Sequence, residues 1–261
     1  MVSTVPRCLS VASSDSGGGA GIQADLRAFA AAGCHGMTAI AALTAQNTLG
    51  VDAVHAVPAS FLRAQLHSVQ RDIGIDAAKT GMLFTAELVD TVADFFVQHP
   101  LPLVVDPVCI ASSGAILLEA SAIEVMVTRL VPLATVVTPN LMEAETLTGS
   151  LGSRRELAER LHGLGAAAVI VTGGHGDGAI DHLFDGREHT EIPVSRHERA
   201  STHGAGCTHS ATLCALLARG LTLREAATEA AARTGDAVAR GLIEIGAGDS
   251  PVDILDIRRR P

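Results

Sequence analysis

Short apolar stretches alternate along the chain with longer stretches rich in alanine and leucine. The short stretches have the length of buried strands, and the longer ones repeat their apolar residues at helical spacing. This pattern predicts strands over residues 7–13, 36–46, 76–79, 101–108, 134–140 and 167–175. It predicts helices over residues 20–32, 60–71, 86–98, 141–149, 155–164, 206–219 and 223–241. Residues 180–194 predict a hairpin, because alternating residues flank a turn at Asp185-Gly186.

Repeated units of strand and helix predict an α/β fold of three α/β/α layers, in which a mostly parallel central sheet carries helices on both faces. No linker, repeat or low-complexity segment interrupts residues 1–261, which we therefore expect to form one domain. Ligands of such sheets bind beyond the carboxyl ends of the strands. The polar residues at those predicted ends, expected to line one rim of the sheet, are Asp15, Gln46, Asp106, Asn140 and Thr172.

The composition narrows the classes of function. Of 261 residues, 48% are hydrophobic, which is enough for a substantial core, and only 2% are aromatic. Few aromatic rings and a net charge of −9 argue against a nucleic-acid partner, because bases stack on rings and the phosphate backbone attracts cations. The sequence shows no secretory signal and no apolar stretch of membrane-spanning length, so we expect a cytoplasmic protein without a membrane partner.

The cysteines predict a reduced protein without disulfides or a zinc site, because their number is odd and they form no CxxC pair. They are Cys8, Cys34, Cys109, Cys207 and Cys214.

A glycine-rich segment, residues 17–21, lies between the first predicted strand and the first predicted helix. It has neither common nucleotide-binding pattern. Ile22-Gln23 follow where a P-loop has lysine and then serine or threonine, and the glycine spacing of a dinucleotide site is missing. Asp25, early in the helix, would also oppose a bound triphosphate. Two interpretations remain: a tight turn with positive φ angles, or a backbone surface that packs against a small uncharged ligand.

A second glycine-rich segment, Gly204-Ala205-Gly206, precedes Cys207 and a predicted helix. Backbone amides at a helix N-terminus form a favourable site for an oxyanion or a phosphate group. Thiols in the first turn of a helix have lowered pKa values, so Cys207 is a candidate reactive group. The alternative is an ordinary helix start with a buried cysteine.

Seven motifs, in order along the chain, resemble those of one family. They are SDSGGGAGIQADL (14–26), TAQNTLGV (44–51), KTGML (79–83), VVDPV (104–108), TPNLMEAE (138–145), GGH (173–175) and HGAGCTHSA (203–211). From about residue 9 to residue 251, the sequence resembles the ribokinase-like superfamily and, within it, the hydroxymethylpyrimidine and phosphomethylpyrimidine kinases of thiamine biosynthesis.

This resemblance implies a ribokinase-like phosphotransferase that uses ATP and Mg²⁺. The enzyme would phosphorylate the hydroxymethyl group of 4-amino-5-hydroxymethyl-2-methylpyrimidine and then convert the monophosphate to the diphosphate. The resemblance also implies a homodimer.

The resemblance further implies that the first glycine-rich segment holds the small substrate rather than the nucleotide. Gln46 would hydrogen-bond the aminopyrimidine, because a carboxamide carries a donor and an acceptor together. A polar strand end without a ligand is the alternative for Gln46. The other residues implied at the substrate are Gly19, Asp25, Met82 and Val108.

For the nucleotide, the resemblance implies that Asp106, Asn140, Thr172 and Gly174 bind ATP. Mg²⁺ would lie beside Asp106 and Glu143, partly through water, because this ion retains its hydration. Asn140 and Glu143 also have the spacing of a helix capping box, and the two roles are compatible.

For catalysis, the resemblance implies that Gly204, Ala205 and Gly206 form an anion hole for the transferring phosphoryl group. Cys207 would take the proton of the substrate, at the position where most ribokinase-like enzymes carry an aspartate. A weak base suffices there, because phosphoryl transfer depends mainly on positioning and charge stabilisation.

A literal Gly-Ala-Gly-Asp motif also occurs at residues 246–249. It follows the last predicted helix and precedes Ser250-Pro251, so we expect a turn there and no catalytic base at Asp249.

Thr172 departs from the family pattern. These kinases usually carry at this position a lysine that reaches the ATP phosphates, so its loss puts the second phosphorylation in question. His175 and His203 are nearby candidates to compensate for the lost charge.

Two other functions are compatible with the sequence. A pyridoxal or pyridoxine kinase also acts on a CH₂OH group of a small heteroaromatic ring, but Gln46 and the segment 17–25 favour the pyrimidine. A non-catalytic sensor of the pyrimidine would bind it without forming ADP.

Overall fold

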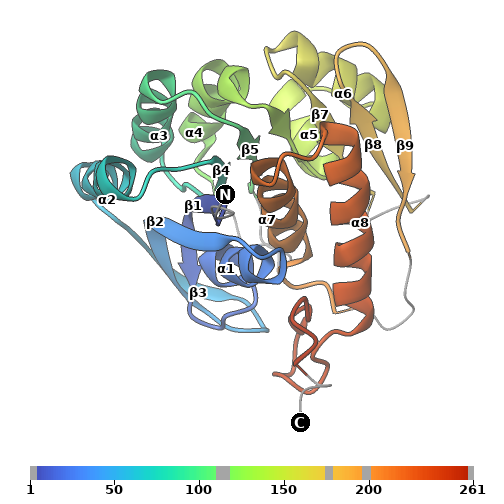
Figure 1. Cartoon of the computed structure of the whole chain (residues 1–261), viewed down its shortest axis with the longest axis horizontal. Coiled ribbons are helices and arrows are strands. Elements are labelled where there is room, and N and C mark those ends of the chain that lie inside the picture. Colours follow the sequence, from blue (N-terminus) through green and yellow to red (C-terminus); the bar gives the residue numbers. More distant parts are fainter. Residues whose placement is uncertain (1–4, 110–117, 174–178, 196–200, 258–261) are drawn as a thin grey trace.

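Nine strands form one sheet at the centre of the structure, a computed structural model that describes residues 5–109, 118–173, 179–195 and 201–257 (Figure 1). The strands are β1 (Arg7–Asp15), β2 (His35–Gln46), β3 (Val51–Ala56), β4 (Ala77–Thr80), β5 (Leu103–Val105), β6 (Val136–Val137), β7 (Val169–Val171), β8 (Ile180–Phe184) and β9 (His189–Pro193). Their order across the sheet is β3-β2-β1-β4-β5-β6-β7-β8-β9.

The sheet is mostly parallel, as the sequence predicts. Strands β2, β1, β4, β5, β6 and β7 are parallel neighbours, whereas β3 at one edge and β8 and β9 at the other pair antiparallel. The chain passes from β1 outward to β2 and β3, and then returns to β4 and proceeds to the opposite edge. Such a reversal opens a crevice beyond the carboxyl ends of the two strands beside it, here β1 and β4.

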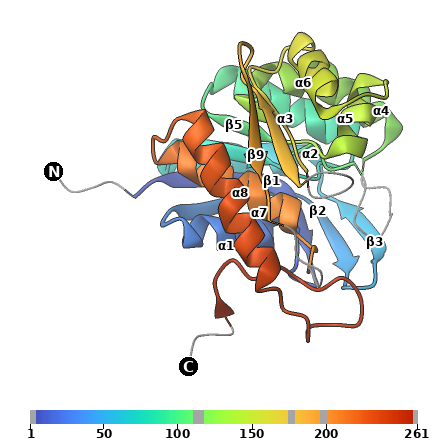
Figure 2. The same ribbon diagram turned by 90° about the vertical axis from the view of Figure 1, so that its right-hand side faces the viewer.

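Helices cover both faces of the sheet in three layers (Figure 2). They are α1 (Gly21–Ala31), α2 (Ala59–Asp72), α3 (Ala86–Gln98), α4 (Ala120–Val125), α5 (Leu141–Thr148), α6 (Arg154–Gly163), α7 (Ala205–Ala218) and α8 (Leu223–Ala239). One face carries α1, α7 and α8, and the other carries α2 to α6. Helix α7 packs on β1, β4 and β5, and its Ser210 donates a hydrogen bond to Asp106 just beyond β5, so its first turns lie at the carboxyl ends of these strands.

The predicted helices all occur within two residues of their predicted bounds, and the predicted hairpin forms as β8 and β9. Three strands are shorter than predicted. Strand β5 is short because Pro102 and Pro107 cannot donate a ladder hydrogen bond, and β6 and β7 keep only their most apolar residues. The hydrophobic pattern predicts neither β3 nor α4, which are short and partly exposed.

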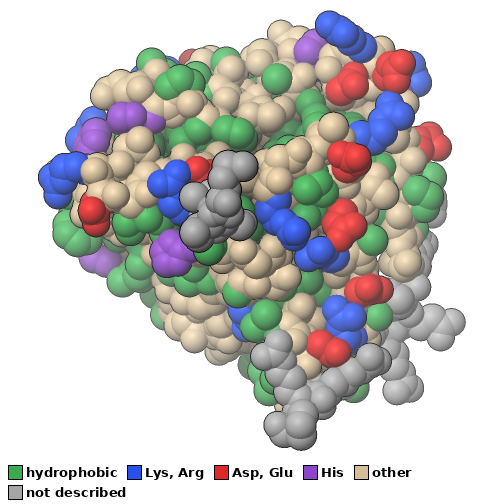
Figure 3. Space-filling view, in the orientation of Figure 1, with side chains coloured by type: hydrophobic (Ala, Val, Ile, Leu, Met, Phe, Trp, Pro, Cys, Tyr) green, Lys and Arg blue, Asp and Glu red, His purple; other side chains and the backbone are tan. Residues whose placement is uncertain are grey.

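The surface shown in Figure 3 carries acidic and basic side chains interspersed over α8. Within this helix Arg233 pairs with Glu229, and Arg224 pairs with Glu188 of the hairpin. Two ion pairs of opposite charge therefore lie on this helix. Among the residues that the structure describes, no helix is long and apolar enough to cross a membrane.

Candidate active site

The first glycine-rich segment folds around the carboxylate of Asp15, the last residue of β1. Asp15 accepts hydrogen bonds from the backbone amides of Gly17, Gly19 and Ala20 at 2.8–2.9 Å. Burial alone would raise the pKa of Asp15, but the ring of His203 and these amides bring it below its ordinary value. Asp15 is therefore an ionised anchor, and the amides of this loop face a carboxylate of the protein itself.

The second glycine-rich segment packs directly on the first. Nε2 of His203 lies 3.0 Å from Oδ2 of Asp15, a residue 188 positions earlier. A Cβ atom at Gly19 would lie 1.9 Å from the His203 ring, and one at Gly204 would lie 1.9 Å from the carbonyl oxygen of Gly19. Gly204 also has a φ of +80°, in the left-handed region. Both positions require glycine, and the two loops form one unit.

Helix α7 begins in the second segment, with Gly204 as its N-cap. The amide of Ala205 donates to the carbonyl oxygen of Thr202 at 3.0 Å, so it is satisfied within its own loop. The amides of Gly206 and Cys207 have no acceptor within the described part of the chain, as is usual in the first turn of a helix. Free amides at the positive end of the helix dipole suit a bound anion.

A buried network of charged side chains lies beneath this helix start. Nζ of Lys79, in β4, lies 2.9 and 3.1 Å from the two carboxylate oxygens of Asp25 and 3.7 Å from Oδ2 of Asp106. Ser10 and Ser210 donate their hydroxyl hydrogens to Asp25 and Asp106. Burial alone would lower the pKa of Lys79, but the carboxylates around it raise the value, so this fully buried amine stays charged.

Sequence reasoning missed Lys79 as a site residue and expected Asp25 beside the substrate. In the structure Asp25 is 0% exposed, and Lys79 and Ser10 occupy both of its oxygens. Asp25 thus acts as the counter-ion of Lys79. The available signal was a lone lysine inside a short strand of small residues, because such a strand is central and a lysine there needs a buried partner.

The thiol of Cys207 lies at the edge of this network. The backbone amide of Gly21 lies near it, and Lys79 is the neighbouring cation. Burial, together with Asp25 and Asp106, raises the pKa of the thiol to about 12, although Lys79 and the Gly21 amide act in the opposite direction. The expected lowering of this pKa at a helix start is therefore wrong, because lost solvation outweighs Lys79 and the Gly21 amide.

Asn140 and Glu143 form the capping box that their spacing predicts. The Asn140 side chain accepts from the amide of Glu143, and the Glu143 carboxylate accepts from the amide of Asn140, both at 2.9 Å. Burial and the neighbouring Asp106 raise the pKa of Glu143. A cation between these two carboxylates would relieve their repulsion. Carboxylate oxygens are ligands that suit Mg²⁺, a hard ion that retains several waters.

The residues implied at the substrate lie around the carboxyl ends of neighbouring strands. Gln46 ends β2 half-buried, and its carboxamide oxygen accepts a hydrogen bond from Thr44 at 3.0 Å. Met82 is buried just beyond β4, and Val108 is half-buried beyond β5. With Asp15 at the end of β1, these residues lie at the carboxyl ends of four neighbouring strands.

The residues that the resemblance implies at the nucleotide lie farther along the same rim. Asn140 and Thr172 extend the pairing of β6 with β7 by a short bridge, and Thr172 is half-buried. Gly174 and His175 lie outside the described residues. His203 is hydrogen-bonded to Asp15, so it is not free to replace the lysine missing at position 172.

The Gly-Ala-Gly-Asp motif at residues 246–249 lies beyond the end of α8 and begins no helix, as predicted. Its Asp249 accepts hydrogen bonds from the amide and the hydroxyl of Thr202 at 2.9 and 2.8 Å. Both carboxylate oxygens are therefore occupied by the protein.

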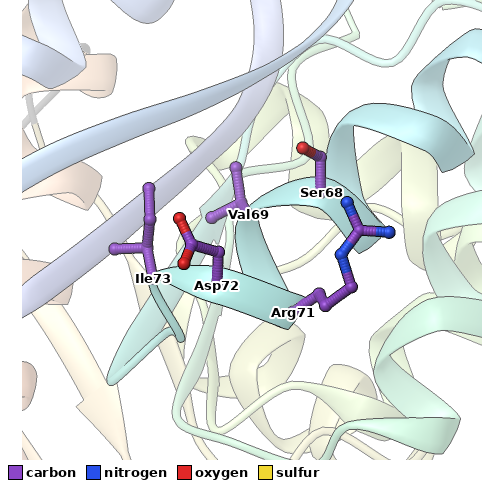
Figure 4. A pocket seen from close by; sticks show the side chains of 5 residues that line it. All are labelled: Ser68, Val69, Arg71, Asp72 and Ile73. Atoms are coloured by element: carbon purple, nitrogen blue, oxygen red, sulfur yellow. The ribbon is translucent and has the colours of Figure 1, made fainter.

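A surface pocket elsewhere lies at the end of α2 (Figure 4). Ile73, in its lining, accepts a hydrogen bond from Arg7 at the amino end of β1. The pocket therefore lies near the amino ends of the strands, whereas the glycine loops lie at their carboxyl ends. Its lining residues are Ser68, Val69, Arg71, Asp72 and Ile73.

Three solved structures resemble this fold over most of its length. The Bacillus subtilis pyridoxal kinase in its ADP complex has a TM-score of 0.90 and 34% identity, covering 98% of this chain and 100% of that chain. The Staphylococcus aureus pyridoxal kinase with AMP-PCP and pyridoxal has a TM-score of 0.88 and 33% identity, covering 98% and 96%. The Clostridium difficile phosphomethylpyrimidine kinase has a TM-score of 0.77 and 36% identity, covering 87% and 96%. The fold and site define a ribokinase-like small-molecule kinase.

The family model described as phosphomethylpyrimidine kinase matches residues 15–253. The hydroxymethylpyrimidine/phosphomethylpyrimidine kinase of Rhizobium meliloti is 45% identical over 252 residues, covering 94% of this chain and 95% of that protein. The thiamine biosynthesis bifunctional protein ThiED of Geobacter sulfurreducens is 45% identical over 264 residues, and this chain spans 54% of its length. The chain belongs to the phosphomethylpyrimidine kinase family, a family of phosphotransferases, which confirms the resemblance read from the seven motifs.

Proposed function

We propose that this protein transfers the γ-phosphoryl group of ATP to the hydroxymethyl group of 4-amino-5-hydroxymethyl-2-methylpyrimidine in thiamine biosynthesis. It then phosphorylates the monophosphate to give the diphosphate. One observation carries the proposal. In a chain of this family, Cys207 stands beside the free amide of Gly206 and the buried cation of Lys79, at the carboxyl ends of β1 and β4.

In the proposed reaction, the hydroxyl oxygen of the substrate attacks the γ-phosphorus, the bond to the ADP oxygen breaks, and Cys207 takes the hydroxyl proton. The amides of Gly206 and Cys207 would stabilise the phosphoryl oxygens, as donors aimed at developing charge. The thiolate is the minor form of Cys207 in the free protein, and Lys79 favours it. Little thiolate suffices, because the transition state is loose and the hydroxyl oxygen becomes acidic only late in the reaction.

The substrate residues divide into two groups in this proposal. Gln46 would recognise the aminopyrimidine edge, and the backbone at Gly19 with Met82 and Val108 would pack against the ring. ATP would lie along Asp106, Asn140, Thr172 and Gly174. Complexes of the similar Staphylococcus aureus kinase with AMP-PCP support ATP as the phosphoryl donor.

Mg²⁺ is the metal that we propose for the second half of the site. Asp106 and Glu143 would hold it, partly through water, and the ion would offset charge on the phosphates. Removal of divalent cations with EDTA should abolish ADP formation, and added Mg²⁺ should restore it.

We also propose a cytoplasmic homodimer in which residues 1–261 form one domain. Support for one domain comes from the contact between Asp15 and His203, since the two glycine loops come from opposite ends of the sequence.

A pyridoxal kinase is the second candidate, because pyridoxal kinases are among the structures most similar to this fold. A sensor that binds the pyrimidine without catalysis is the third.

The deciding experiment measures ADP release by purified protein with Mg·ATP, separately with the pyrimidine alcohol, its monophosphate and pyridoxal. We expect turnover of the alcohol and its loss in Cys207→Ala. Activity on pyridoxal alone would overturn the substrate assignment, and binding of the pyrimidine without any ADP would identify a sensor.

The role of Thr172 has its own test. If the alcohol turns over and the monophosphate does not, Thr172→Lys should restore the second step by supplying the missing cation. If both substrates turn over in the unaltered protein, the lysine is dispensable here.

A further inference from the structure

The Gly-Ala-Gly-Asp turn at residues 246–249 contacts the loop that follows Gln46, although the proposed chemistry does not use this turn. The amide of Gly248 donates to the hydroxyl of Thr48 at 3.2 Å, and the amide of Asp249 donates to the Thr48 carbonyl at 3.0 Å. A Cβ atom at Gly248 would lie 2.0 Å from the Thr48 carbonyl oxygen, and one at Gly246 would lie 2.1 Å from the Thr48 hydroxyl. The glycines thus allow this turn to approach a residue two positions beyond Gln46.

The same turn reaches the loop that precedes Cys207. The two carboxylate oxygens of Asp249 accept hydrogen bonds from the amide and the hydroxyl of Thr202. Just beyond, the amide of Val252 donates to the carbonyl oxygen of His203 at 3.2 Å. Figure 2 shows the segment after α8 running beneath α7 toward the end of the β2–β3 hairpin. One short segment therefore joins the loop after Gln46 to the loop that precedes Cys207.

Four segments contact one another in a closed ring, which we call the substrate ring: residues 15–20, 46–48, 246–249 and 202–204. The hydroxyl of Ser16 exchanges hydrogen bonds of 2.8 Å with the backbone of Gln46, which joins the first segment to the second. His203 joins the fourth segment to the first through Asp15. The turn ending at Asp249 supplies the two remaining joints.

We propose that Asp249 is a positioning residue for the pyrimidine substrate. By joining two segments of the substrate ring, it fixes the position of Gln46 relative to Cys207. Gln46 would contact the pyrimidine of the substrate, and Cys207 would lie at its hydroxymethyl group. The inference rests on the proposed function for the identity of the substrate. Asp249 touches neither reacting group. Its two hydrogen bonds involve a carboxylate, and such charge-assisted bonds are the stronger kind.

The test compares four variants in steady-state kinetics, with the pyrimidine alcohol and ATP varied in turn. Asp249→Ala removes both bonds to Thr202. Asp249→Asn keeps them, because the amide oxygen accepts from the Thr202 amide and the NH₂ group donates to its hydroxyl. Gly248→Ala displaces the same turn through its clash with Thr48 and changes no charge. Asp236→Ala, an exposed acid on α8, is the matched control.

We expect Asp249→Ala and Gly248→Ala each to raise the KM for the alcohol about tenfold, since small displacements of substrate-positioning groups have large effects. Turnover at saturating alcohol and the KM for ATP should stay within about threefold, because the reacting groups remain. Asp249→Asn should keep the KM for the alcohol within about threefold of that of the unaltered protein. Asp236→Ala should have the same KM as the unaltered protein.

Two results would overturn the inference. One is an alcohol KM in Asp249→Ala and Gly248→Ala equal to that of Asp236→Ala. The other is a loss of turnover of about a hundredfold or more in Asp249→Asn, which would make Asp249 a catalytic base instead. If Asp249→Ala does not fold, as judged by circular dichroism, Gly248→Ala and Asp249→Asn decide between the same outcomes.

Failure of the proposed function is distinguishable from failure of the inference. If the unaltered protein forms no ADP with the alcohol, the function fails. The dissociation constant of the alcohol, measured by calorimetry, then tests the role of the substrate ring directly. We expect this constant to rise about tenfold in Asp249→Ala. Unchanged binding would overturn the inference.

Discussion

Cys207 is a half-buried residue at the start of a helix, and burial of its thiol favours the protonated form. With a pKa of about 12, the thiolate fraction at pH 8 is about 10⁻⁴, against about a quarter for an ordinary cysteine. Alkylation of Cys207 by iodoacetamide should therefore be slow at pH 8 and rise about tenfold per pH unit between 7 and 10. Mass spectrometry of the labelled peptide measures the rate, with the urea-unfolded chain as control. A plateau above pH 7 would contradict the raised pKa.

Lys79 is the residue on which the buried charges depend. Removing one partner of a buried ion pair leaves the other charge uncompensated, which typically costs about 3–5 kcal/mol. We expect Lys79→Met to lower the free energy of unfolding by about that amount, and Asp25→Asn in the same chain to recover part of it. Urea unfolding measures both. The control is Arg63→Met, an exposed cation on α2, and equal stability of the two single variants would contradict this role for Lys79.

At the scale of elements, the two glycine loops act as one unit because their backbones touch. Gly204→Ala would place a methyl group against the carbonyl oxygen of Gly19 and should separate the loops. We expect turnover to fall about a hundredfold in a protein that stays folded, since misplacement of about 1 Å has such effects.

Gly33→Ala provides the matched control, because Gly33 also has a positive φ, +75°, but open space around it. It should lose stability through backbone strain and keep its turnover. Equal turnover in the two variants, measured at saturating substrates beside circular dichroism, would show that the loops do not need close contact.

Prediction from the sequence succeeded where the signal is local. Helical periodicity located every predicted helix, and the spacing of Asn140 and Glu143 predicted their capping box. Strand ends were less predictable, because prolines shorten β5 and the sheet needs only a few residues of β6 and β7. The ion pair of Lys79 and the contact of Asp15 with His203 join distant parts of the sequence, and no local pattern carries that information.

The chemistry of the site was predictable only in part, for the same reason. Family motifs named Cys207 and Asp106, but the thiol pKa depends on burial and on carboxylates brought in by other elements. Likewise, the sequence predicts a turn at residues 246–249, but it does not predict the contacts of this turn with Thr48 and Thr202.

For the whole molecule, the exposed hairpin β2–β3 is the surface through which we expect the proposed homodimer to form. Strand β3 is an edge strand, and Leu43 and Leu49 on this hairpin are 46% and 69% exposed. Unpaired edges beside apolar side chains favour association. We expect sedimentation velocity to show a dimer that Leu43→Asp with Leu49→Asp converts to a monomer. Leu151→Asp, at a leucine that is 81% exposed between α5 and α6, should leave the dimer intact.

The closed substrate ring has a consequence for the order of synthesis. A nascent chain that has left the ribosome only through β9 carries every strand of the described sheet, but the apolar surface that α1 shares with α7 and α8 is still uncovered. Two of the four segments of the substrate ring, residues 202–204 and 246–249, have also not yet been made. Catalysis therefore has to await α7, which carries Cys207, and full affinity for the substrate has to await the final turn. A chain stalled after β9 would be inactive and prone to aggregate through that uncovered face.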